Sequence, residues 1–188
     1  MAKHIVTGDQ YRTIDRRMRE IKRMLDQKNG SPLDPEEVAE HLQRIIDQPS
    51  SIIDCSLQPM IPEGWSIREE DQIKSRFQGE LIWSPEKIGL HLDEAQKTGS
   101  IVGNELRKKL EGQPVLPAKV LDYLLAHPAL IPPDWKGKYV YFWGSVYRRS
   151  DGNASVRCLY WGDRGWYWLS YRLGHYWGHR DPGAVLAG

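Results

Sequence analysis

Hydrophobic residues near the N-terminus recur at the spacing of a helix. Five of them are separated by steps of 3, 4, 3 and 4 residues: Tyr11, Ile14, Met18, Ile21 and Leu25. This period places them on one side of an α-helix, with most of the basic residues elsewhere around it. Thr7 and Gln10 have the spacing of a capping box, which satisfies free backbone N–H groups at a helix start. The pattern predicts an amphipathic helix that begins at Thr7 and ends at Asn29–Gly30.

A second helix is predicted after a short turn. Asp34 suits the N-cap, and Pro35 suits the first helical position, where its missing N–H costs nothing. The apolar positions that follow are Val38, Leu42, Ile45 and Ile46. We therefore expect a helical hairpin over residues 1–48. Two helices alone bury too little apolar surface to form a core, so the hairpin is expected to pack on the rest of the chain or on a second copy, as a homodimer. The alternative is that the basic first helix lies on nucleic acid or anionic lipid.

The middle of the chain, residues 49–134, contains shorter patterns bounded by Pro and Gly. Apolar runs predict strands at three places: residues 52–55, 65–68 and 80–83. Helices are also expected at three places: residues 84–98, 104–111 and 117–127. The first of these helices is expected because Ser84 and Pro85 repeat the N-cap and proline pattern of a helix start.

Alternation of side chains over three stretches indicates β-strands. Residues 139–148, 155–161 and 166–173 have this period, and the turns between them contain Asp-Gly and Gly-Asp-Arg-Gly. Residues 135–188 are therefore predicted to form a three-stranded antiparallel β-meander rich in Trp and Tyr. The expected fold class is α+β, with residues 49–188 compatible with one domain.

The two faces of this meander differ chemically. One face is predicted to be core: Val140, Phe142, Val146, Val156, Cys158, Leu169 and Leu173. On the opposite face we select eight residues as candidate ligand-binding residues: Tyr141, Trp143, Tyr147, Arg157, Trp161, Trp166, Trp168 and Arg172. Exposed rings stack on bases or sugars, and arginines contact phosphates. The hypothesis is a non-enzymatic binding protein whose partner is nucleic acid, glycan or protein. The alternative is that this face is covered too, so that the rings are core and the arginines pair with Asp and Glu.

The net charge of +1 conceals a segregation along the chain. Residues 1–30 carry eight Lys/Arg and four Asp/Glu, residues 31–134 carry ten and eighteen, and residues 135–188 carry eight and three. Basic ends and an acidic middle either attract one another in the folded protein or indicate an anionic partner. The basic aromatic segment slightly favours nucleic acid over glycan.

Composition and motifs exclude several classes of function. No apolar run is long enough to cross a bilayer, and the first residues lack the apolar core of a secretory signal, so a cytoplasmic protein without membrane contact is expected. The sequence has no phosphate-binding glycine loop, dinucleotide fingerprint or nucleophile elbow, and no cofactor is expected.

Cys55 and Cys158 are expected to be reduced thiols, since neither belongs to a zinc-ligand pattern. The enzymatic alternative is an unfamiliar site near His175, His179 and Asp181, for which a metal is not favoured.

The aromatic segment also resembles a known group of proteins. WKGK at residues 135–138 and the following YVYFWGSVYRRSDGNASVRCLYW resemble a group of uncharacterised bacterial proteins, many from environmental and candidate-phylum genomes. Their shared pattern is WKGK-x-V-x-FWG-x-x-YR-x-SDG-x-x-x-VR-x-LYW. The opening TGDQYRTIDRRMREIKRMLDQ with SPLDPEEVAEHLQ is similar to the helical start of the same proteins. The resemblance covers most of the chain and implies no function, so it assigns no role to any residue.

Overall fold

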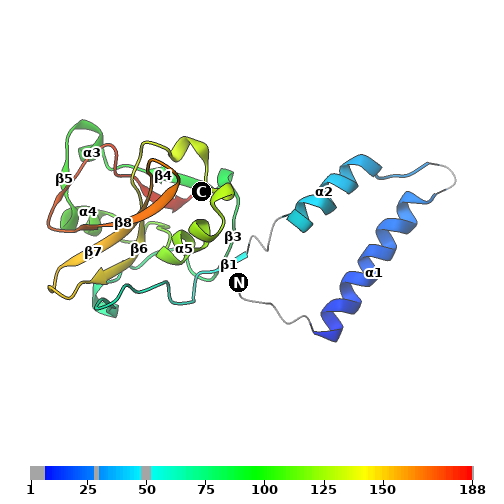
Figure 1. Cartoon of the computed structure of the whole chain (residues 1–188), viewed down its shortest axis with the longest axis horizontal. Helices are drawn as coiled ribbons and strands as arrows, with labels where there is room; N and C mark the ends of the chain where they lie inside the picture. The colour runs from blue at the N-terminus through cyan, green and yellow to red at the C-terminus, as the bar shows by residue number, and fades with distance from the viewer. Residues whose placement is uncertain (1–6, 28–29, 48–51, 188) are drawn as a thin grey trace. The chain divides into compact units, whose positions relative to one another are not determined.

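The computed structural model describes residues 7–27, 30–47 and 52–187, with only the backbone described for residues 44–47. The chain divides into two compact units, residues 1–50 and 51–188 (Figure 1). The α+β class and the antiparallel pairing of the C-terminal strands are confirmed.

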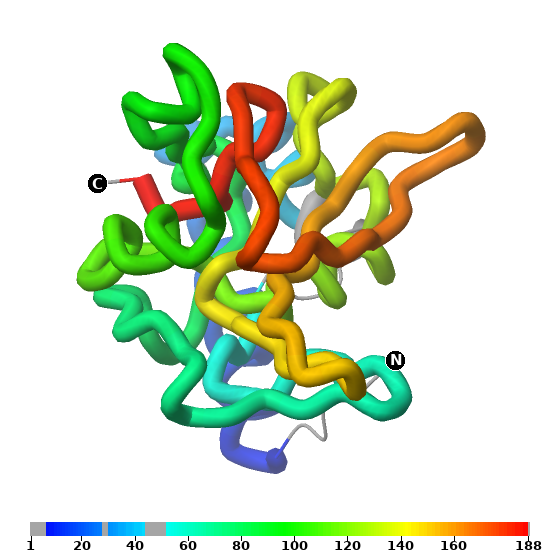
Figure 2. Tube along the Cα trace, turned by 90° about the vertical axis from the view of Figure 1, so that its left-hand side faces the viewer, coloured from blue at the N-terminus to red at the C-terminus, as the bar shows by residue number. Residues whose placement is uncertain are grey.

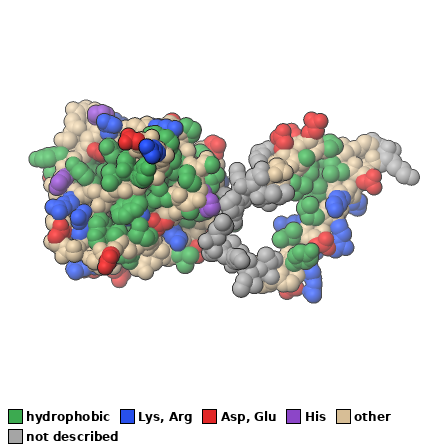
Figure 3. Space-filling model, in the orientation of Figure 1, with side chains coloured by type: hydrophobic (Ala, Val, Ile, Leu, Met, Phe, Trp, Pro, Cys, Tyr) green, Lys and Arg blue, Asp and Glu red, His purple; other side chains and the backbone are tan. Residues whose placement is uncertain are grey.

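The first unit contains helices α1 (Gly8–Leu25) and α2 (Pro35–Asp47). The capping box at the start of α1 is confirmed, because Thr7 and Gln10 exchange hydrogen bonds between side chain and backbone. Asp34 accepts from the N–H of Glu36 at 2.8 Å, as expected of an N-cap. The predicted end at Asn29 and the side chains of Ile45 and Ile46 lie outside the described residues. No residue of α1 is buried, and hydrophobic side chains remain visible on the surface of this unit (Figure 3).

The second unit is built around a sheet that has six strands in the described part of the chain. Five of them lie in the order β4 (Ile88–His91), β10 (Gly183–Leu186), β6 (Val140–Arg148), β7 (Ala154–Trp161) and β8 (Trp166–Arg172). The short β2 (Ser66–Ile67) pairs with one end of β6. Strand β10 is parallel to β6 and antiparallel to β4, so the three predicted strands are part of a larger, mixed sheet.

Shorter elements surround this sheet. Two small sheets pair β1 (Ile52–Asp54) with β3 (Glu80–Ile82), and β5 (Ile101–Val102) with β9 (Tyr176–Trp177). The α-helices of this unit are α3 (Glu94–Thr98), α4 (Gly103–Lys109) and α5 (Ala118–Ala126). Single 3₁₀ turns are η1 (Glu69–Asp71), η2 (Pro85–Lys87), η3 (Pro128–Leu130) and η4 (Pro133–Trp135).

The predicted helix over residues 84–98 is wrong. Ser84 and Pro85 open only the short turn η2, after which the chain extends into β4 and pairs with β10. A new helix, α3, begins after Asp93, which caps it by accepting from the N–H of Ala95. A strand partner about 95 residues away along the chain thus overrides the local helix-start pattern.

Hydrophobic cores cover both faces of the sheet. On one face, α5 and β1 pack on Phe142 and Leu159. On the other, Leu106 of α4 and Trp177 of β9 pack with Trp143. A sheet covered on both sides leaves few of its side chains to solvent.

A β-bulge in β6 breaks the predicted alternation. Tyr141 pairs with Cys158 and Val146 with Val156, so four residues of β6 lie opposite one residue of β7. Val146 therefore shares a core with Tyr141 and Trp143, as do Val156, Cys158 and Leu173, and the prediction that these four residues face the same way as Phe142 is wrong. Leu169, another predicted core residue, is 45% exposed. The side-chain amide of Gln72 replaces a strand partner here, since it accepts from the N–H of Val146 at 2.9 Å and donates to its carbonyl at 2.8 Å.

Replacing Gln72 with alanine is expected to lower the free energy of unfolding by about 1–3 kcal/mol, because both backbone groups of Val146 lose their partner. Chemical denaturation followed by tryptophan fluorescence measures this change. Gln78→Ala is the matched control, since no described hydrogen bond involves the Gln78 side chain, which lines an open pocket. Equal losses in the two variants would contradict the role assigned to Gln72.

Candidate functional site

Four of the eight predicted ligand-binding residues are buried. Tyr141 is 3% exposed, and Trp143, Tyr147 and Arg157 are each 0% exposed. The expectation that they lie on an open face is wrong for two reasons. The register pairs Tyr141 with Cys158, which directs Tyr141 to the opposite side of the sheet from Arg157. Cores then cover both sides.

Arg157 is held in a buried polar cluster. Its Nη1 lies 2.9 Å from Oδ1 of Asp122 and donates to the carbonyl of Met60 at 3.1 Å. The Tyr147 hydroxyl donates to the same carbonyl, and the Met60 N–H donates to Oδ2 of Asp122 at 2.6 Å. The guanidinium lies 4.5 Å from the ring of Trp168. Arg157 therefore agrees with the alternative in which the arginines pair with Asp and Glu and do not bind a ligand.

The other face buries Tyr141 against Trp177, with ring centroids 4.2 Å apart. Burial raises the pKa of the Tyr141 hydroxyl. It also raises the pKa of the Cys158 thiol to about 12 and that of the Cys55 thiol to about 11. Both cysteines are free, and at neutral pH both thiols are protonated, so neither is an activated nucleophile.

Trp161 and Tyr167 are exposed aromatic residues at the end of the β7–β8 hairpin that carries the turn at residues 162–165, whereas Tyr176, which is 69% exposed, lies apart from them in β9. Figure 2 shows this hairpin, in orange, projecting from the rest of the unit. On one face, three tyrosines from adjacent strands form a row across the sheet: Tyr139, Tyr160 and Tyr167. Their ring centroids are 6.0 Å and 5.8 Å apart, and Tyr167 is 45% exposed. We call this set the tyrosine row.

The opposite face of the hairpin end carries a tryptophan pair. The rings of Trp161 and Trp166 meet edge to face at 5.3 Å, and Trp161 is 39% exposed. Nζ of Lys136 lies 3.9 Å from the Trp161 ring, a cation–π contact. Trp168 follows on the same face but is partly buried beside Arg157.

The basic side chains of residues 135–188 fall into two groups, those that pair with a carboxylate and those that do not. Those at the opposite end of the hairpin or in the core pair with carboxylates: Arg148 with Asp71, Arg149 and Arg172 with Asp151, and Arg157 with Asp122. Lys138 lies 3.9 Å from Asp134. In the part of the chain that the structure describes, Lys136, Arg164 and Arg180 have no such partner. Lys136 contacts Trp161, Arg164 lies in the hairpin turn, and the Arg180 guanidinium lies 5.9 Å from the Tyr139 ring.

The hairpin end thus combines exposed rings on both faces with three unpaired cations. Sequence reasoning identified Trp161 and Trp166 in it but missed Tyr160, Tyr167 and the cations Lys136 and Arg180. One signal was available for two of them. The turn at residues 162–165 pairs Trp161 with Trp166, so Tyr160 must lie opposite Tyr167.

Two residues of the enzymatic alternative, His175 and Asp181, have contacts with other groups, while His179 interacts electrostatically with Asp181. The ring of His175 contacts Tyr171 at 5.1 Å, while Asp181 accepts from the N–H of Gly178 at 2.8 Å. Burial raises the pKa of Asp181. Among the described residues there is no group of three or more His, Cys, Asp or Glu side chains that could hold a metal ion.

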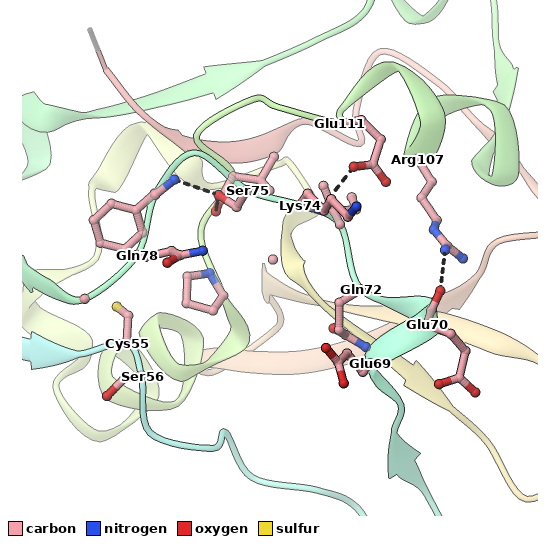
Figure 4. A pocket seen from close by; sticks show the side chains of 16 residues that line it. Cys55, Ser56, Glu69, Glu70, Gln72, Lys74, Ser75, Gln78, Arg107 and Glu111 are labelled. Carbon is pink, nitrogen blue, oxygen red and sulfur yellow. Dashed lines mark hydrogen bonds between the residues drawn. The ribbon is translucent and has the colours of Figure 1, made fainter.

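An open pocket of about 870 Å³ lies elsewhere in this unit (Figure 4). Two of its charged side chains bond to the backbone: Arg107 donates to the carbonyl of Glu70 at 3.3 Å, and Glu111 accepts from the N–H of Lys74 at 3.1 Å. Ser75 donates to the carbonyl of Val115 at 2.9 Å. These contacts hold residues 70–75 next to α4 and the residues that follow it.

Comparisons with known proteins provide no family for this chain. No family model matches it, and neither the curated proteins nor the solved structures contain one that is significantly similar to it. In the described ranges, no helix has the length and apolar character needed to span a bilayer.

Proposed function

We propose that the protein is a non-enzymatic binding protein that holds single-stranded nucleic acid at the hairpin end of its sheet. The observation that carries the proposal is the coincidence of exposed aromatic rings with unpaired cations. Arg180 lies beside Tyr139, at one end of the tyrosine row, and Arg164 lies in the hairpin turn at residues 162–165. These cations are not neutralised by a carboxylate, so they can contact phosphates, although Nε of Arg180 already donates to the carbonyl of Gly137 at 3.2 Å.

The tyrosine row suits unpaired bases. Base stacking on an aromatic side chain is worth about 1–3 kcal/mol and depends little on sequence, because every base has a flat face. The Tyr hydroxyls add hydrogen-bonding edges to an otherwise flat surface. A double helix keeps its bases stacked inside, so a row of rings favours a single strand.

Tyr167→Ala and Arg180→Ala are each expected to weaken binding of a labelled mixed-sequence oligonucleotide of about 12 nucleotides by roughly tenfold. Fluorescence anisotropy of the full chain measures this loss. Three phosphate contacts predict that the logarithm of affinity falls with the logarithm of salt concentration with a slope of about −2 for a single strand. Arg180→Ala should reduce the magnitude of that slope by about 0.7.

Arg172→Ala is the matched control for these variants. Arg172 is a surface arginine of the same hairpin, but it is paired with Asp151 at 2.8 Å, so its loss should change affinity little. Absence of oligonucleotide binding at low salt, or equal losses for Arg172→Ala and Arg180→Ala, would refute the proposal. Binding of a polysaccharide without salt dependence would favour the glycan alternative, and a protein partner is the remaining one.

Self-association of the helices is a separate expectation for the first unit. Tyr11 and Ile14 of α1 are 69% and 56% exposed, which supports an apolar stripe that needs a partner.

Membership of the bacterial group, a cytoplasmic location and the absence of a cofactor also stay predictions.

A further inference from the structure

The outer edge of β8 is a long strand edge without a partner in the described part of the chain. β8 pairs with β7 along seven consecutive residues without a register shift, and it is the last strand in the order of the sheet. The opposite edge strand, β4, has four residues. Proteins usually protect a long edge with lysine, proline or a bulge. β8, with the sequence WYWLSYR, contains no lysine, proline or bulge, and its one charged residue, Arg172, lies at its end.

The hydrogen bonds at both ends of the hairpin show which backbone groups point outward. The N–H of Gly162 donates to the carbonyl of Gly165 at 2.9 Å, and that of Leu173 donates to Ala154 at 2.9 Å. In an antiparallel ladder, bonded and non-bonded pairs alternate. The backbone groups of Trp166, Trp168 and Ser170 therefore point away from β7. In the described residues no hydrogen bond to these groups is present outside the ladder.

From this edge we infer that two copies of the chain associate through antiparallel pairing of β8 with β8, forming one continuous sheet. The strand is complementary to itself when the two copies pair about Leu169. All seven residues then overlap, and Leu169 faces its own copy. Trp166 lies opposite Arg172 of the second copy, and Tyr167 lies opposite Tyr171. The only charged side chain thus meets a ring rather than a like charge.

The exposed side chains of β8 also favour a second copy of this strand as its partner. Tyr167 and Leu169 lie on one face and are each 45% exposed, so pairing covers apolar surface as well as backbone groups. A two-fold axis at Leu169 keeps corresponding faces on the same side of the joined sheet. The two tyrosine rows then share one face and are offset by four residues along the strands, about 13 Å. One nucleic-acid strand could cross both rows.

A cysteine at residue 169, on the proposed two-fold axis, tests the register of the β8–β8 pairing. Leu169→Cys in the full chain is expected to form a disulfide between copies under mild oxidation at least about tenfold faster than Ile82→Cys, because an axial pair in an antiparallel ladder brings its Cβ atoms to about 4.5–5.5 Å. Ile82 is a fair control, since it is 56% exposed on the edge of another sheet. Equal rates for the two variants would overturn the inference.

A charge at the same position tests the association itself. Leu169→Lys places two ammonium groups opposite each other and should raise the dissociation constant of the dimer by about tenfold or more. Analytical ultracentrifugation measures it, and an unchanged far-UV circular dichroism spectrum shows that the fold is kept. A dimer that Leu169→Lys leaves intact, for example one formed by the N-terminal helices, would also overturn the inference. Oligonucleotide binding is read out separately, so failure of the proposed function leaves the cross-linking result standing.

Discussion

Replacing Asp122 with alanine is expected to lower the free energy of unfolding of residues 51–188 by about 3–5 kcal/mol, because it leaves the Arg157 cation buried without a counter-charge. Arg157 is 0% exposed, and its Nε and Nη2 have no hydrogen-bond partner among the described residues. The variant also removes the acceptor of the Met60 N–H, which holds the loop that covers the arginine. Urea denaturation followed by tryptophan fluorescence measures the loss.

Two further variants separate this effect from a general loss of charge. Asp151→Ala removes the exposed partner of Arg172 and should cost less than about 1 kcal/mol. The double variant Asp122→Leu with Arg157→Met removes both charges and should recover much of the stability, since apolar replacement of a whole buried pair is often neutral. If Asp122→Ala were no more harmful than Asp151→Ala, the cluster around Arg157 would not be the determinant that its burial implies.

Replacing Gly103 with alanine is expected to cost about 3 kcal/mol of unfolding free energy, because a Cβ at this position overlaps fixed atoms. It would lie 2.4 Å from Nε1 of Trp177 and 2.8 Å from the carbonyl oxygen of Leu173. Neither neighbour can easily move away. Trp177 is fully buried, and the Leu173 carbonyl accepts from the N–H of Asn104 at 2.9 Å.

Gly174→Ala is the control for this substitution. Gly174 lies next to Leu173, its φ is not positive, and a Cβ there would meet no atom within 4 Å. Thermal unfolding should show a drop of several degrees for Gly103→Ala and almost none for Gly174→Ala. Similar melting temperatures for the two variants would mean that α4 can move away from Trp177.

Local patterns predicted those elements whose determinants are close in sequence. The turn at residues 162–165 specifies the β7–β8 pairing, and Thr7 with Gln10 specifies the start of α1. Distant partners determined what the patterns missed. β4 exists because β10 pairs with it, and nothing near residues 88–91 indicates that partner. The backbone of Val146, at the end of the bulge in β6, is bonded to Gln72, 74 residues earlier in the chain.

Only part of the candidate site could be predicted from the sequence, because residues distant along the chain determine the rest. Alternation within a strand identified which residues share a face of that strand, but the pairing of β6 with β7 decided which faces coincide. Arginine is seldom fully buried, so the sequence favoured an exposed Arg157. Its partner Asp122 belongs to α5, 35 residues away, and no local signal connects the two.

The position of β10 has a consequence for synthesis of the protein. This strand lies inside the sheet, between β4 and β6, although it comes last among the strands along the chain. Neither neighbour can complete its pairing until residues 183–186 leave the ribosome. At about 5–20 residues per second, the interval between completion of Arg148 and of Leu186 is roughly 2–8 s. Until residues 183–186 are available, β4 and β6 each keep an unfinished edge, and until residue 177 is made, Tyr141 and Trp143 lack the Trp177 ring that packs on them.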